Sequence, residues 1–257
     1  MIKAIFFDID GTLVSFRTHE ISPKVMEDLY ALRGKGIKLF IASGRHYLVM
    51  DNLQDFPFDG YISMNGSLVT VGGEVVSCRT LGADTARKVG LMCRQHGLPA
   101  VAFCRGSYGI SMQNDLTRKT FEMIRLHDVP LYSWDSLVYE DVCQFTIFAD
   151  QRQEKELFTE GLDSVTLSRW FPSFFDMNTK GLSKAEGIAA VIERFGITAD
   201  EVMAFGDGGN DSEMLKYAGT GIAMGNADDT ARSAADYVTL TVDQDGISHA
   251  LRHFGLL

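Results

Sequence analysis

Residues 4–12 read Ala-Ile-Phe-Phe-Asp-Ile-Asp-Gly-Thr, an apolar run that leads directly into two aspartates. A short continuous apolar run is typical of a strand that is buried on both faces of a parallel sheet. Ligands of open α/β sheets bind beyond the carboxyl ends of such strands. We therefore expect Asp8 and Asp10 at a functional edge of the sheet. Alternation along an extended chain points both side chains to the same side.

The two carboxylates allow more than one interpretation. They can share one metal ion, or one can act as a nucleophile while the other donates a proton. Asp and Gly are also common turn formers, so the pair followed by Gly11 can be a simple turn. The motif alone does not decide between these readings.

The composition is typical of a soluble globular protein. The chain has 257 residues, of which 46% are hydrophobic and 23% are charged. Because no apolar run approaches the roughly 18 residues of a membrane span, we expect no membrane association. The N-terminus shows no signal-type stretch, so we expect a cytoplasmic protein. We expect it to be a monomer or a small homo-oligomer.

The net charge and the cysteine spacing argue against nucleic-acid binding and against zinc or redox motifs. A net charge of −10 argues against nucleic acid as a partner, because nucleic acid binding depends on clustered Lys and Arg. The four cysteines show neither zinc nor redox spacing, so we expect reduced thiols in apolar surroundings. They are Cys78, Cys93, Cys104 and Cys143.

Strand and helix patterns alternate at both ends of the chain. Ser22-Pro23 is a good helix start, and strand-like runs at 38–42 and 60–63 follow it. The alternation of helix and strand patterns begins again at Ser183, and we expect strands at 202–205 and 219–223. This alternation predicts an α/β fold with a doubly wound, Rossmann-like parallel sheet as its core.

The middle of the chain departs from this rhythm. From about Val69 a hairpin pattern around Gly72-Gly73 gives way to mixed helical and strand-like stretches. Helical patterns occupy 83–96, 114–127 and 151–161. We predict a discontinuous core of residues 1–80 and 178–257, with an inserted α+β cap at 81–177 that selects the substrate.

The other expected core strands are also followed by polar or glycine residues. The carboxyl ends of parallel strands meet at one edge of a sheet, so these residues should converge with the two aspartates. Taken singly, each has a plain alternative as a helix cap, a turn residue or a surface charge. The residues are Ser43, Gly44 and Arg45 after 38–42, Asn65 after 60–63, and Asp207, Asn210 and Asp211 after 202–205.

Lys184 and the acidic loop carry most of the chemical information. A cation in the first turn of a helix opposes the macrodipole, so Lys184 calls for a functional reason unless it simply extends into solvent. Asp207 and Asp211 offer the hard oxygen ligands that suit magnesium. A glycine-rich turn with capping acids is the alternative reading of that loop.

Taken together, these motifs resemble those of the haloacid dehalogenase superfamily of phosphohydrolases. The long insert after Asn65-Gly66 is similar to that of the Cof-type branch, which carries a large α/β cap. The resemblance covers the core closely, and the cap only in size and element pattern. It rests on Asp8-x-Asp10-Gly11-Thr12, Ser43, Lys184 and Gly206-Asp207-x-x-Asn210-Asp211.

The resemblance implies a role for each of these residues. Asp8 would be the nucleophile and Asp10 the acid that protonates the leaving oxygen and later activates water. Mg2+ would be held by the Asp8 carboxylate, the Asp10 backbone carbonyl and Asp207. Asn210 and Asp211 would steady the waters of the metal or Lys184. The phosphate and substrate would be held by Ser43, Gly44, Arg45, Asn65 and Lys184.

Electrostatics are compatible with this assignment. The carboxylates and the phosphate carry more negative charge than Mg2+ and Lys184 can neutralise, so backbone amides at helix starts must contribute. We expect a magnesium-dependent phosphatase that acts on a small phosphorylated metabolite, by resemblance a sugar phosphate. A phosphomutase of the same superfamily and a non-catalytic sugar-phosphate sensor are the alternatives.

Overall fold

The apolar run at the start of the chain forms a central strand, β1 (Ala4–Phe7), in the computed structural model. The structure describes residues 1–257, apart from the side chain of Trp170. All residues of β1 are fully buried, as expected for a strand covered on both faces. The strand pairs in parallel with β2 (Lys38–Ala42) and β11 (Val202–Gly206).

The first sheet has eight strands in the order β13-β12-β11-β1-β2-β3-β4-β5. From β3 to β13 this is the doubly wound order, in which the winding reverses between β1 and β11. The predicted hairpin joins β4 to β5 and extends the edge of the same sheet. The remaining strands are β3 (Gly60–Ser63), β4 (Leu68–Val71), β5 (Glu74–Cys78), β12 (Thr220–Ala223) and β13 (Tyr237–Val238).

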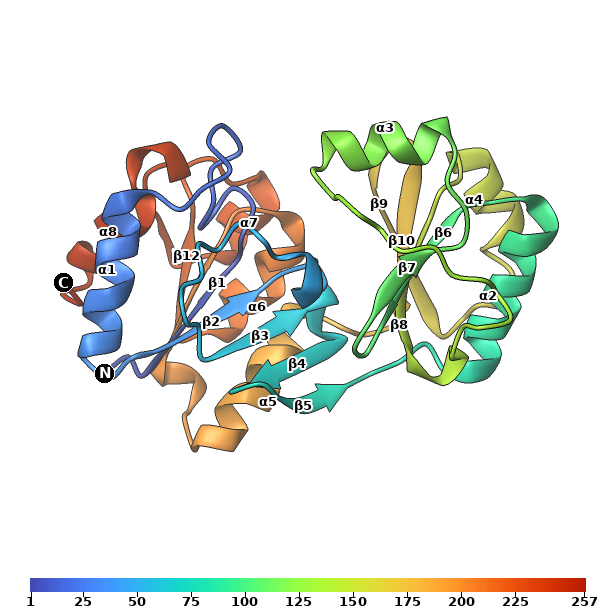
Figure 1. The fold of residues 1–257 in the computed structure, drawn as a ribbon. Coiled ribbons are helices and arrows are strands. Elements are labelled where there is room, and N and C mark those ends of the chain that lie inside the picture. Colours follow the sequence, from blue (N-terminus) through green and yellow to red (C-terminus); the bar gives the residue numbers. More distant parts are fainter. The chain divides into compact units, whose positions relative to one another are not determined.

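Helices cover both faces of this sheet. Ile5 and Phe7 point to one face and pack with α1 (Pro23–Gly34) and α8 (Gly246–His253), which lie side by side in Figure 1. Phe6 points to the opposite face. That face is covered by α5 (Lys184–Phe195), α6 (Ser212–Tyr217) and α7 (Asp229–Ala234).

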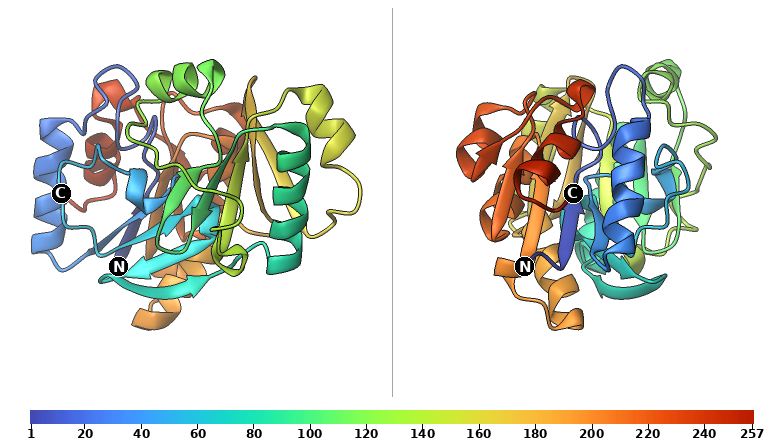
Figure 2. Two further views of the ribbon diagram at one scale, coloured as in Figure 1. Left: turned by 45° about the vertical axis from the view of Figure 1, so that its right-hand side comes forward. Right: turned by 90° about the vertical axis from the view of Figure 1, so that its left-hand side faces the viewer.

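The chain divides into two compact units, Met1–Ser77 with Ser183–Leu257, and Cys78–Leu182. Figure 2 shows that both termini lie in the first unit. The α/β class, with a doubly wound core and an inserted α+β unit, is confirmed. The predicted role of residues 81–177 as a substrate-selecting cap stays a prediction.

The second unit contains a five-stranded sheet in the order β7-β6-β8-β10-β9. Its pairings are antiparallel, and α2 and α4 lie on the same face of the sheet (Figures 1 and 2). The strands are β6 (Ala100–Cys104), β7 (Tyr108–Ile110), β8 (Val142–Ile147), β9 (Val165–Phe171) and β10 (Phe174–Thr179). The helices are α2 (Ala83–His96), α3 (Asp115–Met123) and α4 (Gln151–Leu157).

Helix ends in this unit show where the sequence pattern holds and where it fails. α2 has the predicted bounds, because Gly97 takes the left-handed conformation that ends a helix. α3 ends at Met123, short of the predicted 127, and Arg125 has a φ of 56° that a helix cannot accommodate. Among the described residues, no helix combines the length and apolar character needed to cross a bilayer.

Candidate active site

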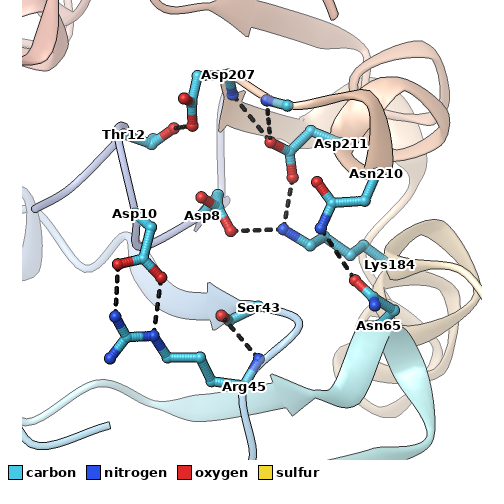
Figure 3. A network of polar contacts seen from close by, with 11 residues as sticks. Asp8, Asp10, Thr12, Ser43, Arg45, Asn65, Lys184, Asp207, Asn210 and Asp211 are labelled. Carbon is cyan, nitrogen blue, oxygen red and sulfur yellow. Dashed lines mark hydrogen bonds and ion pairs between the residues drawn. The ribbon is translucent and has the colours of Figure 1, made fainter. Parts of the chain in front are cut away.

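Neighbouring strands of the first sheet bring the predicted residues together. Asp8 follows β1, while Ser43 follows β2 and Asp207 follows β11. The parallel register aligns Phe7 with both Phe205 and Ile41, so the three strands end side by side. Figure 3 shows the side chains from these strand ends gathered in one polar network.

Lys184 lies at the centre of this network. It is the first residue of α5, and its side chain is fully buried. Its Nζ is 2.5 Å from Oδ1 of Asp8 and 2.5 Å from Oδ1 of Asp211. Burial lowers the pKa of Lys184, but the carboxylates of Asp211 and Asp8 outweigh that effect and raise it. The two ion pairs thus explain a cation at a position that the helix macrodipole disfavours.

Asp211 also shapes the loop that follows β11. Its Oδ2 accepts hydrogen bonds from the backbone N–H groups of Asp207 and Gly208, each 2.9 Å long. A Cβ at Gly206 would collide with the Asp211 side chain, so the strand must end in glycine there. Asp211 therefore uses one oxygen to hold Lys184 and the other to hold the backbone of the loop.

Asp207 is held by Thr12 and Asn226, two residues for which we expected no role from the sequence. Thr12 Oγ1 donates a 2.8 Å hydrogen bond to Oδ1 of Asp207. Asn226 Nδ2 lies 3.2 Å from Oδ2 of Asp207 and 2.8 Å from the carbonyl oxygen of Gly11. Thr12 belongs to the opening motif, but spacing alone could not show that it contacts a residue 195 positions away.

The acidic residues provide a candidate metal site. One oxygen from each of Asp8, Asp207 and Asp211 lies within 4.8 Å of the others. Such hard oxygen donors fit Mg2+. Asp211 is only 1% exposed and is bound to Lys184 and two backbone N–H groups, whereas Asp8 and the half-buried Asp207 follow adjacent strands and are better placed to bind a cation directly. The backbone carbonyl of Asp10 as a ligand stays a prediction.

Burial makes these carboxylates costly to ionise. It raises the pKa of Asp8 well above its ordinary value, although Lys184 acts in the opposite direction. It also raises the pKa of Asp207 to about 6, against the effect of the hydrogen bond from Thr12. A bound cation would favour the ionised form of both groups, so the cluster is electrostatically suited to one.

Arg45 and Asp10 bind each other. Arg45 Nε lies 2.8 Å from Oδ2 of Asp10, and Nη2 lies 2.6 Å from Oδ1 (Figure 3). This is a bidentate, charge-assisted pair. From the sequence we expected Arg45 at the substrate and Asp10 at the leaving oxygen, whereas the structure joins the two side chains to each other.

The remaining predicted residues, Ser43, Gly44, Asn65 and Asn210, lie together beside Lys184, and we call this group the rim of the site. Ser43 is buried, and its Oγ accepts a 3.2 Å hydrogen bond from the backbone N–H of Arg45, across Gly44. The backbone N–H of Asn65 donates to the carbonyl of Ser43 at 3.0 Å. Asn210 Nδ2 donates to Oδ1 of Asn65 at 3.1 Å, so Asn210 contacts the rim while Asp211 contacts Lys184.

The sequence profile of haloacid dehalogenase-like hydrolases matches residues 5–251. The chain is a haloacid dehalogenase-like hydrolase. The resemblance inferred from the motifs is thereby confirmed, and the hydrolase is an enzyme of the phosphatase class.

Individual relatives of this hydrolase span its whole length. It is 33% identical to the "Putative phosphatase YkrA" of Bacillus subtilis (strain 168), over 99% of this chain and 98% of YkrA. It is 29% identical to the 5-amino-6-(5-phospho-D-ribitylamino)uracil phosphatase YcsE of the same organism, over 99% and 96% of the two chains. The solved structure of BT4131, described as a subclass IIB sugar phosphatase, is 38% identical, with a TM-score of 0.88 over 99% and 100% of the two chains.

Proposed function

We propose that this hydrolase is a magnesium-dependent phosphatase that cleaves small phosphorylated metabolites, sugar phosphates above all, through a phosphoryl group carried on Asp8. The observation that carries the proposal is the buried bridge of Lys184 between Asp8 and Asp211, with Asp207 at the end of the adjacent strand. An ion pair with a purely structural role would not need a further carboxylate, that of Asp207, whose ionisation is made costly by burial.

In the first step, a carboxylate oxygen of Asp8 forms a bond to phosphorus, and the bond from phosphorus to the leaving oxygen breaks. Lys184 engages Oδ1 of Asp8, which leaves Oδ2 as the attacking oxygen. Lys184 and the donors around Ser43 offset the negative charge of the transferred group. Mg2+ held by Asp8, Asp207 and the carbonyl of Asp10 would supply further positive charge there.

The pairing of Arg45 with Asp10 suggests how the acid becomes available. A guanidinium fork binds a phosphate as well as it binds a carboxylate. We infer that the substrate phosphate displaces Asp10 from Arg45. The released carboxylate of Asp10 then takes up a proton from solvent and donates it to the leaving oxygen. In the second step, a water donates a proton to Asp10 and its oxygen bonds to phosphorus, while the bond from phosphorus to Asp8 breaks and phosphate is released.

The substrate class rests on resemblance and on chemistry. BT4131 is described as a sugar phosphatase and matches this chain over its full length. YcsE acts on a phosphorylated ribityl compound, whose leaving group is also a polyol. We assign selection of the leaving group to the inserted unit, and we retain the cytoplasm as the expected location.

A substrate panel tests the proposal. Phosphate release would be measured for sugar phosphates, nucleotides, pyridoxal phosphate and flavin mononucleotide, with Mg2+ and with EDTA, using Asp8→Asn as the control. We expect release from sugar phosphates only with Mg2+ and only with Asp8 intact. Phosphoryl return to a sugar that depends on a bisphosphate would instead identify a mutase. Ligand binding without any turnover would identify a sensor.

A further inference from the structure

Two cysteines outside the candidate active site contact each other. Sγ of Cys78 lies 3.7 Å from Sγ of Cys143, although 65 positions separate them in the chain. Cys78 is the last residue of β5 and Cys143 lies in β8, and both belong to the second unit. Both cysteines are reduced.

The surroundings of the two thiols differ. Cys78 is partly exposed, whereas Cys143 is buried. The guanidinium of Arg105 lies close enough to Cys78 to act on its sulfur, and it lies 3.7 Å from Oδ1 of Asp141. Sγ of Cys143 donates towards the backbone carbonyl of Asp141 at 3.5 Å. The expectation of four thiols in apolar surroundings is therefore wrong for Cys78.

These contacts shift the pKa values of the two thiols in opposite directions. The contact with Cys143 lowers the pKa of Cys78, and Arg105 adds to this effect, against burial and Asp141. The same contact, together with burial, raises the pKa of Cys143. Burial alone raises the pKa of Cys93 to about 12. A partly exposed thiol near a guanidinium, in contact with a second, buried thiol, is the arrangement of an attacking cysteine and its resolving partner.

We propose that Cys78 and Cys143 form an oxidation site that closes to a disulfide when a hydroperoxide reaches Cys78. The Cys78 thiolate attacks the terminal oxygen of the peroxide, the O–O bond breaks, and Cys78 becomes a sulfenic acid while water or an alcohol leaves. The sulfur of Cys143 then attacks the sulfur of Cys78. A disulfide forms, the sulfenic oxygen leaves as water, and the peroxide has been reduced by the two electrons that the thiols lost.

The geometry requires only a small movement. A disulfide has an S–S length of about 2.05 Å, so the two sulfurs must approach by less than the width of one atom. The bond would fix the last residue of β5 to β8, and Cys78 is also the residue at which the second unit begins. Oxidation would thus tie the start of this unit to a strand inside its sheet.

Peptide mapping of the oxidised protein tests the proposal. The full chain is reduced, treated with hydrogen peroxide, alkylated and digested without reductant. We expect the peptide of Cys78 to be joined to the peptide of Cys143, with Cys93 and Cys104 alkylated and the link reversed by dithiothreitol. Cys143→Ser should leave a sulfenic acid at Cys78 that reacts with dimedone. Cys104→Ser is the matched control and should retain the link.

Several outcomes would overturn the proposal. These are a link that involves Cys104, a link between two copies of the chain, and oxidation of Cys78 no faster than that of buried Cys93. Because the mapping uses the unaltered protein, it decides the question even if a variant fails to fold. Phosphate release is not part of the readout, so failure here is distinct from failure of the proposed phosphatase activity.

Discussion

The ammonium of Lys184 and the carboxylate of Asp8 lie 2.5 Å apart inside the protein, although 176 positions separate them in the chain. Lys184 also holds Asp211 at 2.5 Å, so one buried cation serves two carboxylates. Removing one partner of a buried ion pair lowers the free energy of unfolding by more than the intact pair contributes to it, because the remaining charges stay unpaired. Lys184 should therefore matter for both folding and activity.

Lys184→Met tests this dependence. At neutral pH the variant should lose about 3–5 kcal/mol of unfolding free energy. It should also lose about 10³-fold in kcat, because a charge that stabilises the transition state is gone. Chemical denaturation and phosphate release measure the two effects. The exposed Lys180→Met is the matched control, and a Lys184→Met protein as stable as this control would contradict the account.

Asp207 makes the metal-free protein sensitive to pH. Burial raises its pKa from 3.8 to about 6, so the folded state binds this proton more tightly than the unfolded state does. Stability in EDTA should therefore fall as the pH rises from about 4 to 6, by up to about 3 kcal/mol. Urea unfolding across this range measures the slope. The fall of unfolding free energy with pH should be less steep in Asp207→Asn. An equally steep fall in this variant would show that another group causes the pH dependence.

Metal affinity should show the opposite dependence on pH. Mg2+ needs the ionised form of Asp207, so its affinity should fall about tenfold for each pH unit below 6. Isothermal titration calorimetry at several pH values measures this directly. An affinity that is constant between pH 5 and 7 would exclude Asp207 as a ligand that titrates in this range.

Thr12 should support the metal through Asp207. Thr12→Val keeps the shape of the side chain but removes the hydroxyl that donates to Oδ1 of Asp207. Loss of such an orienting hydrogen bond typically costs 10- to 100-fold in metal affinity, and we expect about that decrease for Mg2+. Thr18→Val, at an exposed position, is the control. Equal affinities in the two variants would show that Thr12 does not orient the ligand.

Arg45 should act on the substrate phosphate and on Asp10 together. Arg45→Gln should lower kcat/KM by about 10²-fold, because a phosphate-binding fork is lost. Arg45→Lys should recover only part of this activity, since an ammonium cannot form the bidentate contact. Steady-state kinetics on a responsive sugar phosphate measure both. Arg17→Gln, at an exposed arginine, should leave the kinetics unchanged.

The core could be predicted from the sequence because its signals are local. The apolar run of β1 and the polar residues directly after it fix both the strand and the position of Asp8. Residues at the carboxyl ends of parallel strands must then meet at one edge. For this reason Asp8, Asp207 and Lys184 could be placed near one another from motifs far apart in the chain.

Contacts between side chains of distant residues could not be predicted. The pairing of Arg45 with Asp10 and the contact between Cys78 and Cys143 depend on rotamers and strand register that no spacing rule encodes. The early end of α3 depends on the positive φ of Arg125, a residue type that rarely adopts one. These features follow from tertiary packing, which overrides local propensity.

The central claim is that Asp8 carries the phosphoryl group during turnover. The direct measurement is to quench the enzyme during hydrolysis of a sugar phosphate, reduce any acyl phosphate with borohydride and locate the reduced residue by peptide mass spectrometry. We expect a substrate-dependent reduction of the side chain at position 8. Reduction at Asp10 or Asp207 instead, or none while phosphate release continues, would show that Asp8 does not carry the phosphoryl group.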